Sequence, residues 1–125
     1  MTKTVNYDLE ERTTKFSEKV IKFAKKISVN PISQRIIPQL IASSTSIGAN
    51  YCEADDAESS KDFKHKIGIC KKEARETKYW LRVIANITDL EELKSEARTL
   101  WKEAKELHLI FNAIYRKVNE KQRQN

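Results

Sequence analysis

Apolar side chains recur along this chain at alternating spacings of three and four residues, in four separate segments. Such spacing places them on one side of an α-helix, which has about 3.6 residues per turn. The pattern predicts helices at about 8–28, 34–55, 60–87 and 89–119, after a mobile lead-in. The residues that we expect to face the core are Leu9, Thr13, Phe16, Val20, Phe23, Ile27, Ile37, Leu40, Ser44, Ile47, Tyr51, Ala54, Phe63, Ile67, Cys70, Ala74, Thr77, Leu81, Ile84, Leu90, Leu93, Ala97, Leu100, Ala104, Leu107, Phe111, Ile114 and Val118.

Prolines and serines mark the joints between these segments. The first helix is expected to end before Pro31, and Ser59 or Ser60 to cap the third. Pro38 would cost about 3 kcal/mol deep inside a helix, so we expect the second helix to begin close to it or to bend there. Gly48 lies in the middle of that helix, where we expect another helix backbone to approach closely.

Four helices with short joints predict one domain, residues 1–125, with an all-α fold: an antiparallel, up-down-up-down, left-handed four-helix bundle. The 2 glycines, 2 prolines and 34% charged residues agree with a helical protein. No apolar run approaches the roughly 18 to 20 residues of a membrane span, and the first residues lack the apolar core of a signal peptide. We therefore expect a cytoplasmic protein without a membrane segment.

The two cysteines, Cys52 and Cys70, are expected on consecutive helices, out of register by about 12 Å at ~1.5 Å per residue. This offset is too large for a disulfide bond. We therefore expect both thiols to be reduced and mostly buried. We do not expect them to bind a metal or to act as nucleophiles, because they lack a C-x-x-C spacing and a nearby histidine.

Positive charge is arranged in lines along two of the predicted helices. The chain has 24 basic and 18 acidic residues, a net charge of +6. The line on the third helix consists of Lys64, Lys71, Arg75, Lys78 and Arg82, and the line on the first consists of Lys15, Lys19, Lys22 and Lys26. Each line is either a surface that binds the phosphates of a nucleic acid or a solvated helix face.

A strip of polar residues borders the core on the second and third helices. On the second helix it contains Ser43, Ser46, Asn50 and Glu53, and on the third it contains Glu73, Glu76 and Trp80. The strip is either solvated or a polar network at a contact between subunits, with Arg35, Arg75 or Arg82 as partners of the carboxylates. We predict an oligomer interface at Ser46, Asn50, Glu53, Glu73, Glu76 and Trp80.

Patterns typical of catalysis are missing from the sequence. A di-metal carboxylate bundle needs Glu three residues before each ligating His, but Asp62 precedes His65 and Lys105 precedes His108. The serines of the second helix have no neighbouring histidine, and there is no glycine-rich phosphate loop. We therefore expect no catalytic residues, no metal and no cofactor, and do not expect an enzyme.

Three segments resemble the bacterial four-helix bundle family that includes the proteins encoded in intervening sequences of 23S ribosomal RNA genes. They are SIGANYCEA at 46–54, AESSKDFKHKIGI at 57–69 and KKEARETKYWL at 71–81. The matching positions are Ser46, Ile47, Asn50, Glu53, Asp62, Phe63, Glu73, Glu76, Tyr79, Trp80 and Leu81. The chain departs from the family pattern at Ala54, where glycine is common.

The resemblance implies an antiparallel four-helix bundle that assembles into a homo-oligomeric ring, a pentamer. It also implies a basic surface that binds RNA or DNA. A related branch, the accessory variability determinant of diversity-generating retroelements, implies a reverse transcriptase as a partner. Our first hypothesis is therefore a non-catalytic scaffold that binds nucleic acid through its basic lines, and the alternative is an adaptor that binds proteins only.

Overall fold

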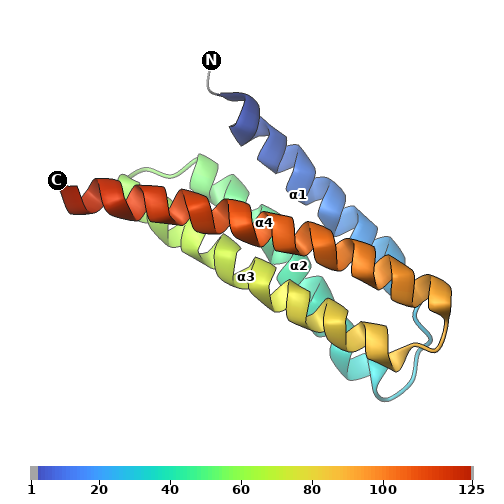
Figure 1. Cartoon of the computed structure of the whole chain (residues 1–125). Helices are drawn as coiled ribbons and strands as arrows, with labels where there is room; N and C mark the ends of the chain where they lie inside the picture. The colour runs from blue at the N-terminus through green and yellow to red at the C-terminus, as the bar shows by residue number, and fades with distance from the viewer. Residues whose placement is uncertain (1–2, 125) are drawn as a thin grey trace.

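The computed structural model describes the backbone of residues 3–124 and the side chains of residues 9–124. The regular secondary structure of these residues is all α-helical, with no β-strand. None of its helices is long and apolar enough to cross a membrane. The four helices, shown in Figure 1, are α1 (Lys3–Ala24), α2 (Ser33–Asp55), α3 (Ser60–Ile87) and α4 (Glu91–Gln124).

The bounds of α1 and α4 differ most from the predicted ranges. Helix α1 already begins at Lys3, inside the predicted lead-in, of which Met1 and Thr2 lie outside the described residues. The helix ends at Ala24, and the next turn tightens: the Ile27 N–H donates to the Ala24 carbonyl at 3.2 Å. Helix α4 continues to Gln124, beyond the predicted end at 119.

Two capping arrangements set the starts of α2 and α3. The Asn30 side-chain oxygen accepts hydrogen bonds from the N–H groups of Ile32 and Ser33, both at 2.9 Å. Helix α2 then runs through Pro38 without interruption. The hydroxyl oxygen of Ser59 accepts from the Asp62 N–H at 3.0 Å, so Ser59 is the N-cap of α3.

The helices form a bundle in which each packs against the next along the chain (Figure 1). Helix α3 packs extensively against both α2 and α4, whereas α1 and α4 have much less contact. Figure 1 shows why: α1 approaches α4 near the α3–α4 loop and diverges from it toward the N-terminus. One edge of the bundle is therefore partly open.

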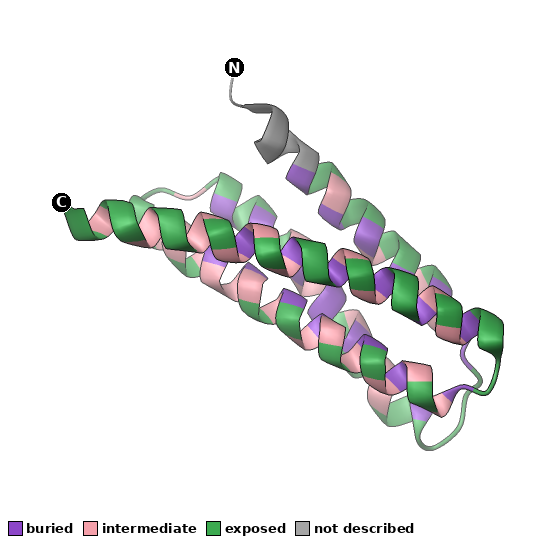
Figure 2. Cartoon of the chain, in the orientation of Figure 1, coloured by how far each residue is buried: buried purple, intermediate pink, exposed green. Residues whose placement is uncertain are grey.

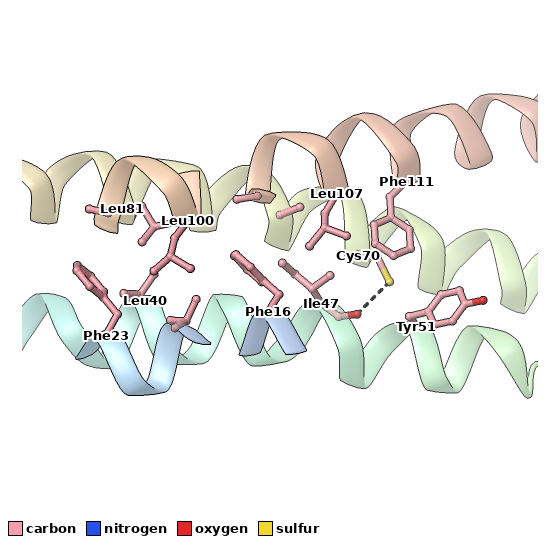
Figure 3. Packing of buried hydrophobic residues seen from close by; sticks show 14 of the residues in the cluster. Phe16, Phe23, Leu40, Ile47, Tyr51, Cys70, Leu81, Leu100, Leu107 and Phe111 are labelled. Carbon is pink, nitrogen blue, oxygen red and sulfur yellow. Dashed lines mark hydrogen bonds between the residues drawn. The ribbon is translucent and has the colours of Figure 1, made fainter. Parts of the chain in front are cut away.

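The core lies along the facing sides of all four helices, as the purple bands of Figure 2 show. Figure 3 shows large side chains from each helix meeting there, among them Phe16, Leu40, Leu81 and Phe111. The predicted core positions are buried with five exceptions. Four of these are half-buried: Ile37, Phe63, Ile114 and Val118.

The fifth exception is Leu90, whose prediction as a core residue is wrong. Its side chain is 59% exposed. Leu90 lies just before α4, and its carbonyl accepts the first hydrogen bonds of the helix, from Leu93 and Lys94, each at 3.0 Å. The buried side of α4 therefore does not include Leu90, because this residue precedes the first helical turn.

Ser43 and Cys52 also differ from their predicted environments. Ser43 is 1% exposed and lies in the core instead of on the bordering strip. The Thr77 hydroxyl lies 3.0 Å from the Ser43 hydroxyl and joins α3 to α2. Cys52 is exposed, whereas Cys70 is buried, as predicted, with its thiol directed at the Ile47 carbonyl oxygen at 3.5 Å (Figure 3).

Gly48 marks the close approach between α1 and α2 that the sequence predicts. A Cβ atom at this position would lie 3.0 Å from the Thr13 hydroxyl oxygen and 3.7 Å from the Thr13 backbone carbonyl carbon. The Thr13 hydroxyl is held in place because it donates to the Leu9 carbonyl at 2.8 Å. Glycine therefore allows two helix backbones to come together here.

Candidate nucleic-acid interface

The predicted basic line of α3 lies beside α4. At one end, the Lys64 ammonium donates to the side-chain oxygen of Asn119 at 2.7 Å. Farther along, the Lys78 ammonium lies 3.5 Å from His108 Nδ1. The line is therefore not an isolated solvated face, because its lysines reach across to polar and aromatic groups of the neighbouring helix.

Three rings of α4, from Trp101, His108 and Tyr115, follow this line. They are seven residues apart, which places them on one side of the helix. The Tyr115 ring has the Lys71 ammonium 4.5 Å from its centroid. Trp101 likewise has the Lys78 ammonium at 5.9 Å. Such contacts attract the cation to the ring and reduce the number of positions that a long lysine side chain can take.

Gly68 makes room for the Tyr115 ring. A Cβ atom on Gly68 would lie 3.1 Å from Tyr115 Cε1, closer than an ordinary van der Waals contact. Gly68 lies one turn from Lys64 and one turn from Lys71. The Lys64 ammonium is 5.6 Å from the same ring centroid, so the ring lies between two lysines because the residue between them has no side chain.

Several carboxylates and several cations of α4 lie on different sides of the helix. Its carboxylates Glu103 and Glu96 pair with cations of α1: Glu103 receives two hydrogen bonds from Arg12, at 2.7 and 2.8 Å, and Glu96 one from Lys26, at 2.9 Å. The cations Lys94, Arg98 and Lys105 lie on the side of α3, which sequence reasoning missed because acids and bases alternate along α4. The heptad spacing of the α4 rings was the signal in the sequence that could have identified this side of the helix.

We call the surface formed by the cations of both helices the α3–α4 cationic face. It consists of Lys64, Lys71, Arg75, Lys78, Arg82, Lys94, Arg98 and Lys105.

The α3–α4 cationic face has an excess of positive charge. Among the described residues, no carboxylate forms an ion pair with any of its eight cations. Burial lowers the pKa of the half-buried His108, and the charges of Lys78, Arg75 and Lys71 lower it further. The neutral imidazole is therefore favoured by the same positive field that would attract an anion.

The lysine line of α1 has a different environment. Lys26 pairs with Glu96, and Lys15 lies 3.8 Å from Glu11. Lys15 and Lys19 border a pocket between α1 and α4 whose other lining residues include Glu103 and Glu106. Carboxylates thus partly neutralise this line, and it does not join the α3–α4 cationic face.

The predicted polar strip pairs mainly within single helices. The Asn50 amide donates to the carbonyl and the hydroxyl oxygen of Ser46, both at 2.9 Å, and the Trp80 indole N–H donates to Glu76 at 3.0 Å. Burial, followed by the charge of Glu76, raises the pKa of Glu73.

Within one chain, two of the described carboxylates of the strip have partners other than the arginines that we expect across a subunit contact. Glu53 pairs instead with Lys66, at 2.5 Å, and this pair joins α2 to α3. In residues 9–124, no ion pair joins the strip to Arg35, Arg75 or Arg82. Nor does this part of the chain contain a group of three or more His, Cys, Asp or Glu residues that could hold a metal ion.

Comparisons with known proteins agree with the fold of the chain. The family model of the 23S rRNA-intervening sequence protein matches residues 6–113. A crystal structure of a protein of unknown function from the S23 ribosomal protein family of Bacteroides thetaiotaomicron superimposes with a TM-score of 0.76 and is 27% identical, covering 89% of this chain and 97% of that one. No curated protein matches the chain. The chain belongs to the 23S rRNA-intervening sequence protein family.

Proposed function

We propose that this chain is a non-catalytic protein whose α3–α4 cationic face binds the phosphates of RNA or DNA. The observation that carries the proposal is the set of eight cations along two packed helices, none of which forms an ion pair among the described residues. Phosphate oxygens of a nucleic acid would supply the missing negative charge. Lysines already held against rings lose less conformational freedom when they bind.

The length of the face sets the size of the expected footprint. The α3 cations extend from Lys64 to Arg82, a distance of roughly 27 Å at ~1.5 Å per residue. Phosphates along one strand are about 3.4 Å apart, so the face is long enough for roughly eight of them. Contacts of this kind do not read base edges, so we expect binding that depends little on sequence and strongly on salt.

The scaffold that we infer is an antiparallel, up-down-up-down bundle with left-handed packing. Contacts between α2 and α3 support the antiparallel order, because Ile47 meets Cys70 while the later Glu53 meets the earlier Lys66. The contacts between α3 and α4 follow the same rule, since Lys64 meets Asn119 while the later Lys78 meets the earlier His108. Alternating spacings of three and four apolar residues are typical of left-handed packing near 20°.

We also propose that copies of the chain assemble into a ring through the polar strip of α2 and α3. Support comes from the half-buried Trp80 beside Tyr79, whose side chain is 59% exposed, with ring centroids 4.9 Å apart. Assembly would repeat the α3–α4 cationic face and increase avidity without new contacts. Light scattering tests this: Glu76→Gln should change the mass or the stability of the assembly, and unchanged values would remove the strip as the interface.

A mobility-shift titration tests nucleic-acid binding directly. In one variant Lys64, Lys71 and Lys78 are changed together to Glu, and in a matched control Lys15, Lys19 and Lys22 are changed to Glu. Both variants change the net charge equally, but only the first alters the α3–α4 cationic face. We expect the first to lose most of its affinity for RNA and DNA and the control to keep most of it. Equal losses, or no loss in either, would contradict the proposed site.

A protein-binding adaptor is the second candidate, and the exposed Tyr79 beside Trp80 favours it. Aromatic side chains of this kind are common at protein interfaces. Capture experiments with and without nuclease distinguish the two functions. Partners that are lost after nuclease treatment support nucleic-acid binding, and partners that remain support the adaptor.

A further inference from the structure

A pocket of about 480 Å³ opens between α3 and α4, near the loop that joins them. Its volume is within the range of small-ligand sites, about 300 to 1,000 Å³. Small or apolar side chains, Leu81, Ala85 and Ala97, form part of the lining. The other lining residues are Arg82, Asn86, Lys94, Arg98, Trp101 and Lys102, so the pocket has an indole, an amide and four cations but no carboxylate.

Trp101 separates this pocket from the rest of the α3–α4 cationic face. The two lysines near its ring, Lys78 and Lys105, lie farther from the α3–α4 loop along each helix and do not line the pocket. On α4, the pocket residues Lys94, Ala97 and Arg98 lie between Trp101 and the loop. The indole therefore borders the pocket, and the Lys78 and Lys105 ammonium groups lie 5.9 and 5.7 Å from the centroid of the same ring.

The pocket between α1 and α4 shows what is distinctive about this arrangement. It has a similar volume, about 430 Å³, and also contains several cations. Its lining includes Glu103 and Glu106, and Arg12 is paired with Glu103. It has no tryptophan. An anionic, flat ligand is therefore matched by the pocket beside Trp101 and not by the one beside α1.

We propose that the pocket beside Trp101 holds one unpaired base of a bound single strand, stacked on the indole, with the adjoining phosphates on Arg82 and Arg98. The proposal rests on the nucleic-acid binding proposed above and adds a preference for strands with free bases. A flat base fits the indole and the small side chains of Ala85 and Ala97, and the arginines can each form two hydrogen bonds to a phosphate. Asn86 offers an amide to the edge of the base. A paired base in a duplex cannot enter.

The experiment compares three labelled probes by fluorescence anisotropy: an oligothymidylate strand, a blunt duplex, and an abasic strand with as many phosphates as the oligothymidylate. Base stacking on an aromatic side chain predicts that the oligothymidylate binds at least about fivefold more tightly than the abasic strand. Trp101→Leu should remove this preference, and it should weaken duplex binding only by the roughly two- to fivefold expected from the lost contacts of Lys78 and Lys105 with the ring. Ala85→Leu fills the pocket but keeps Trp101 and the cations, so it should remove the preference and leave duplex affinity unchanged.

Tryptophan fluorescence gives a second readout. The chain has two tryptophans, so Trp80→Phe leaves Trp101 as the sole reporter. Oligothymidylate should quench it, and the abasic strand should not. Two results would overturn the proposed base-binding pocket and leave the proposed function intact. One is binding of all three probes without a preference for free bases, and the other is a preference that survives both pocket variants. No binding of any probe would overturn both.

Discussion

The Lys71 ammonium lies 4.5 Å from the centroid of the Tyr115 ring, which approaches α3 closely because residue 68 is glycine. The Tyr115 ring therefore holds the Lys71 ammonium in place at the surface of the protein. This contact shows how the α3–α4 cationic face is built: α3 supplies charges, and α4 supplies the rings against which they pack. Both helices are needed for the surface that we propose to bind phosphates.

Gly68→Ala tests this arrangement. The new Cβ would lie 3.1 Å from Tyr115 Cε1, so the ring must move away from the two lysines. Loss of cation–π contacts of about 0.5 to 1 kcal/mol predicts a two- to fivefold weaker affinity for nucleic acid. Anisotropy titration measures it. Gly48→Ala is the matched control, since it also alters a glycine inside a helix but lies against Thr13, and it should leave affinity unchanged.

Because of His108, we expect the affinity for nucleic acid to depend on pH. Burial and the charges of Lys78, Arg75 and Lys71 lower its pKa in the free protein. A bound polyanion adds negative charge and raises that pKa, so binding takes up a proton and affinity increases as the pH falls through the pKa of His108 in the complex. A rise of one pKa unit would strengthen binding by at most about tenfold.

Anisotropy between pH 7.5 and 5.5 at constant ionic strength measures this effect. His108→Gln should weaken the pH dependence, whereas the control His65→Gln, which changes an exposed histidine, should not. If both variants keep the pH dependence of the unmodified protein, His108 is not the group that takes up the proton.

In the free protein, His108 should have the opposite effect: stability should fall as the pH falls, whereas binding strengthens. Because the pKa of His108 is lowered in the folded state, the unfolded chain binds the proton more readily. The contribution of this residue to stability is therefore present above the unfolded pKa of about 6.5 and is lost as the pH falls from that value through the lower pKa of the folded state. Urea unfolding at pH 7.5 and 5.5 should show a smaller loss for His108→Gln than for the unmodified chain.

Core truncations test the packing of the bundle. Leu81 is 0% exposed and Leu100 is 4% exposed. Changing either to Ala should lower the free energy of unfolding by about 2 to 5 kcal/mol in urea titrations. Leu109→Ala provides a control on the same helix as Leu100, because Leu109 is 51% exposed and should lose no more than about 0.5 kcal/mol. Losses well under 1 kcal/mol at both core sites would contradict the core assignment.

The two thiols should differ in reactivity. Burial raises the pKa of Cys70 to about 12, and its side chain has no contact with solvent. Cys52 is exposed, although partial desolvation and nearby carboxylates raise its pKa as well. Thiol titration at pH 8 should therefore find one reactive group per native chain and two after unfolding. Two fast-reacting thiols in the native protein would contradict the buried position of Cys70.

The sequence was sufficient for the four helices and most of the core, because an apolar face repeats locally with the period of the helix. Leu90 was misassigned because this periodicity continues one position before the first turn, where the backbone caps the helix. The α4 half of the cationic face was missed for a different reason. Periodicity shows which side of α4 is buried but not which neighbour each flank meets, so Glu103 and Lys105 looked like parts of one mixed surface.

The salt dependence of binding tests the central claim most directly. For each phosphate contact, the slope of log affinity against log salt concentration changes by about 0.7 for single strands and 0.9 for duplex DNA. We compare the unmodified chain with Lys71→Gln/Lys78→Gln and with the control Lys15→Gln/Lys19→Gln. The account predicts a steep slope for the unmodified chain. In the first variant the slope should become shallower by the amount expected for about two phosphate contacts, and in the control it should be unchanged. An unchanged slope in the first variant, or an equal change in both, would contradict it.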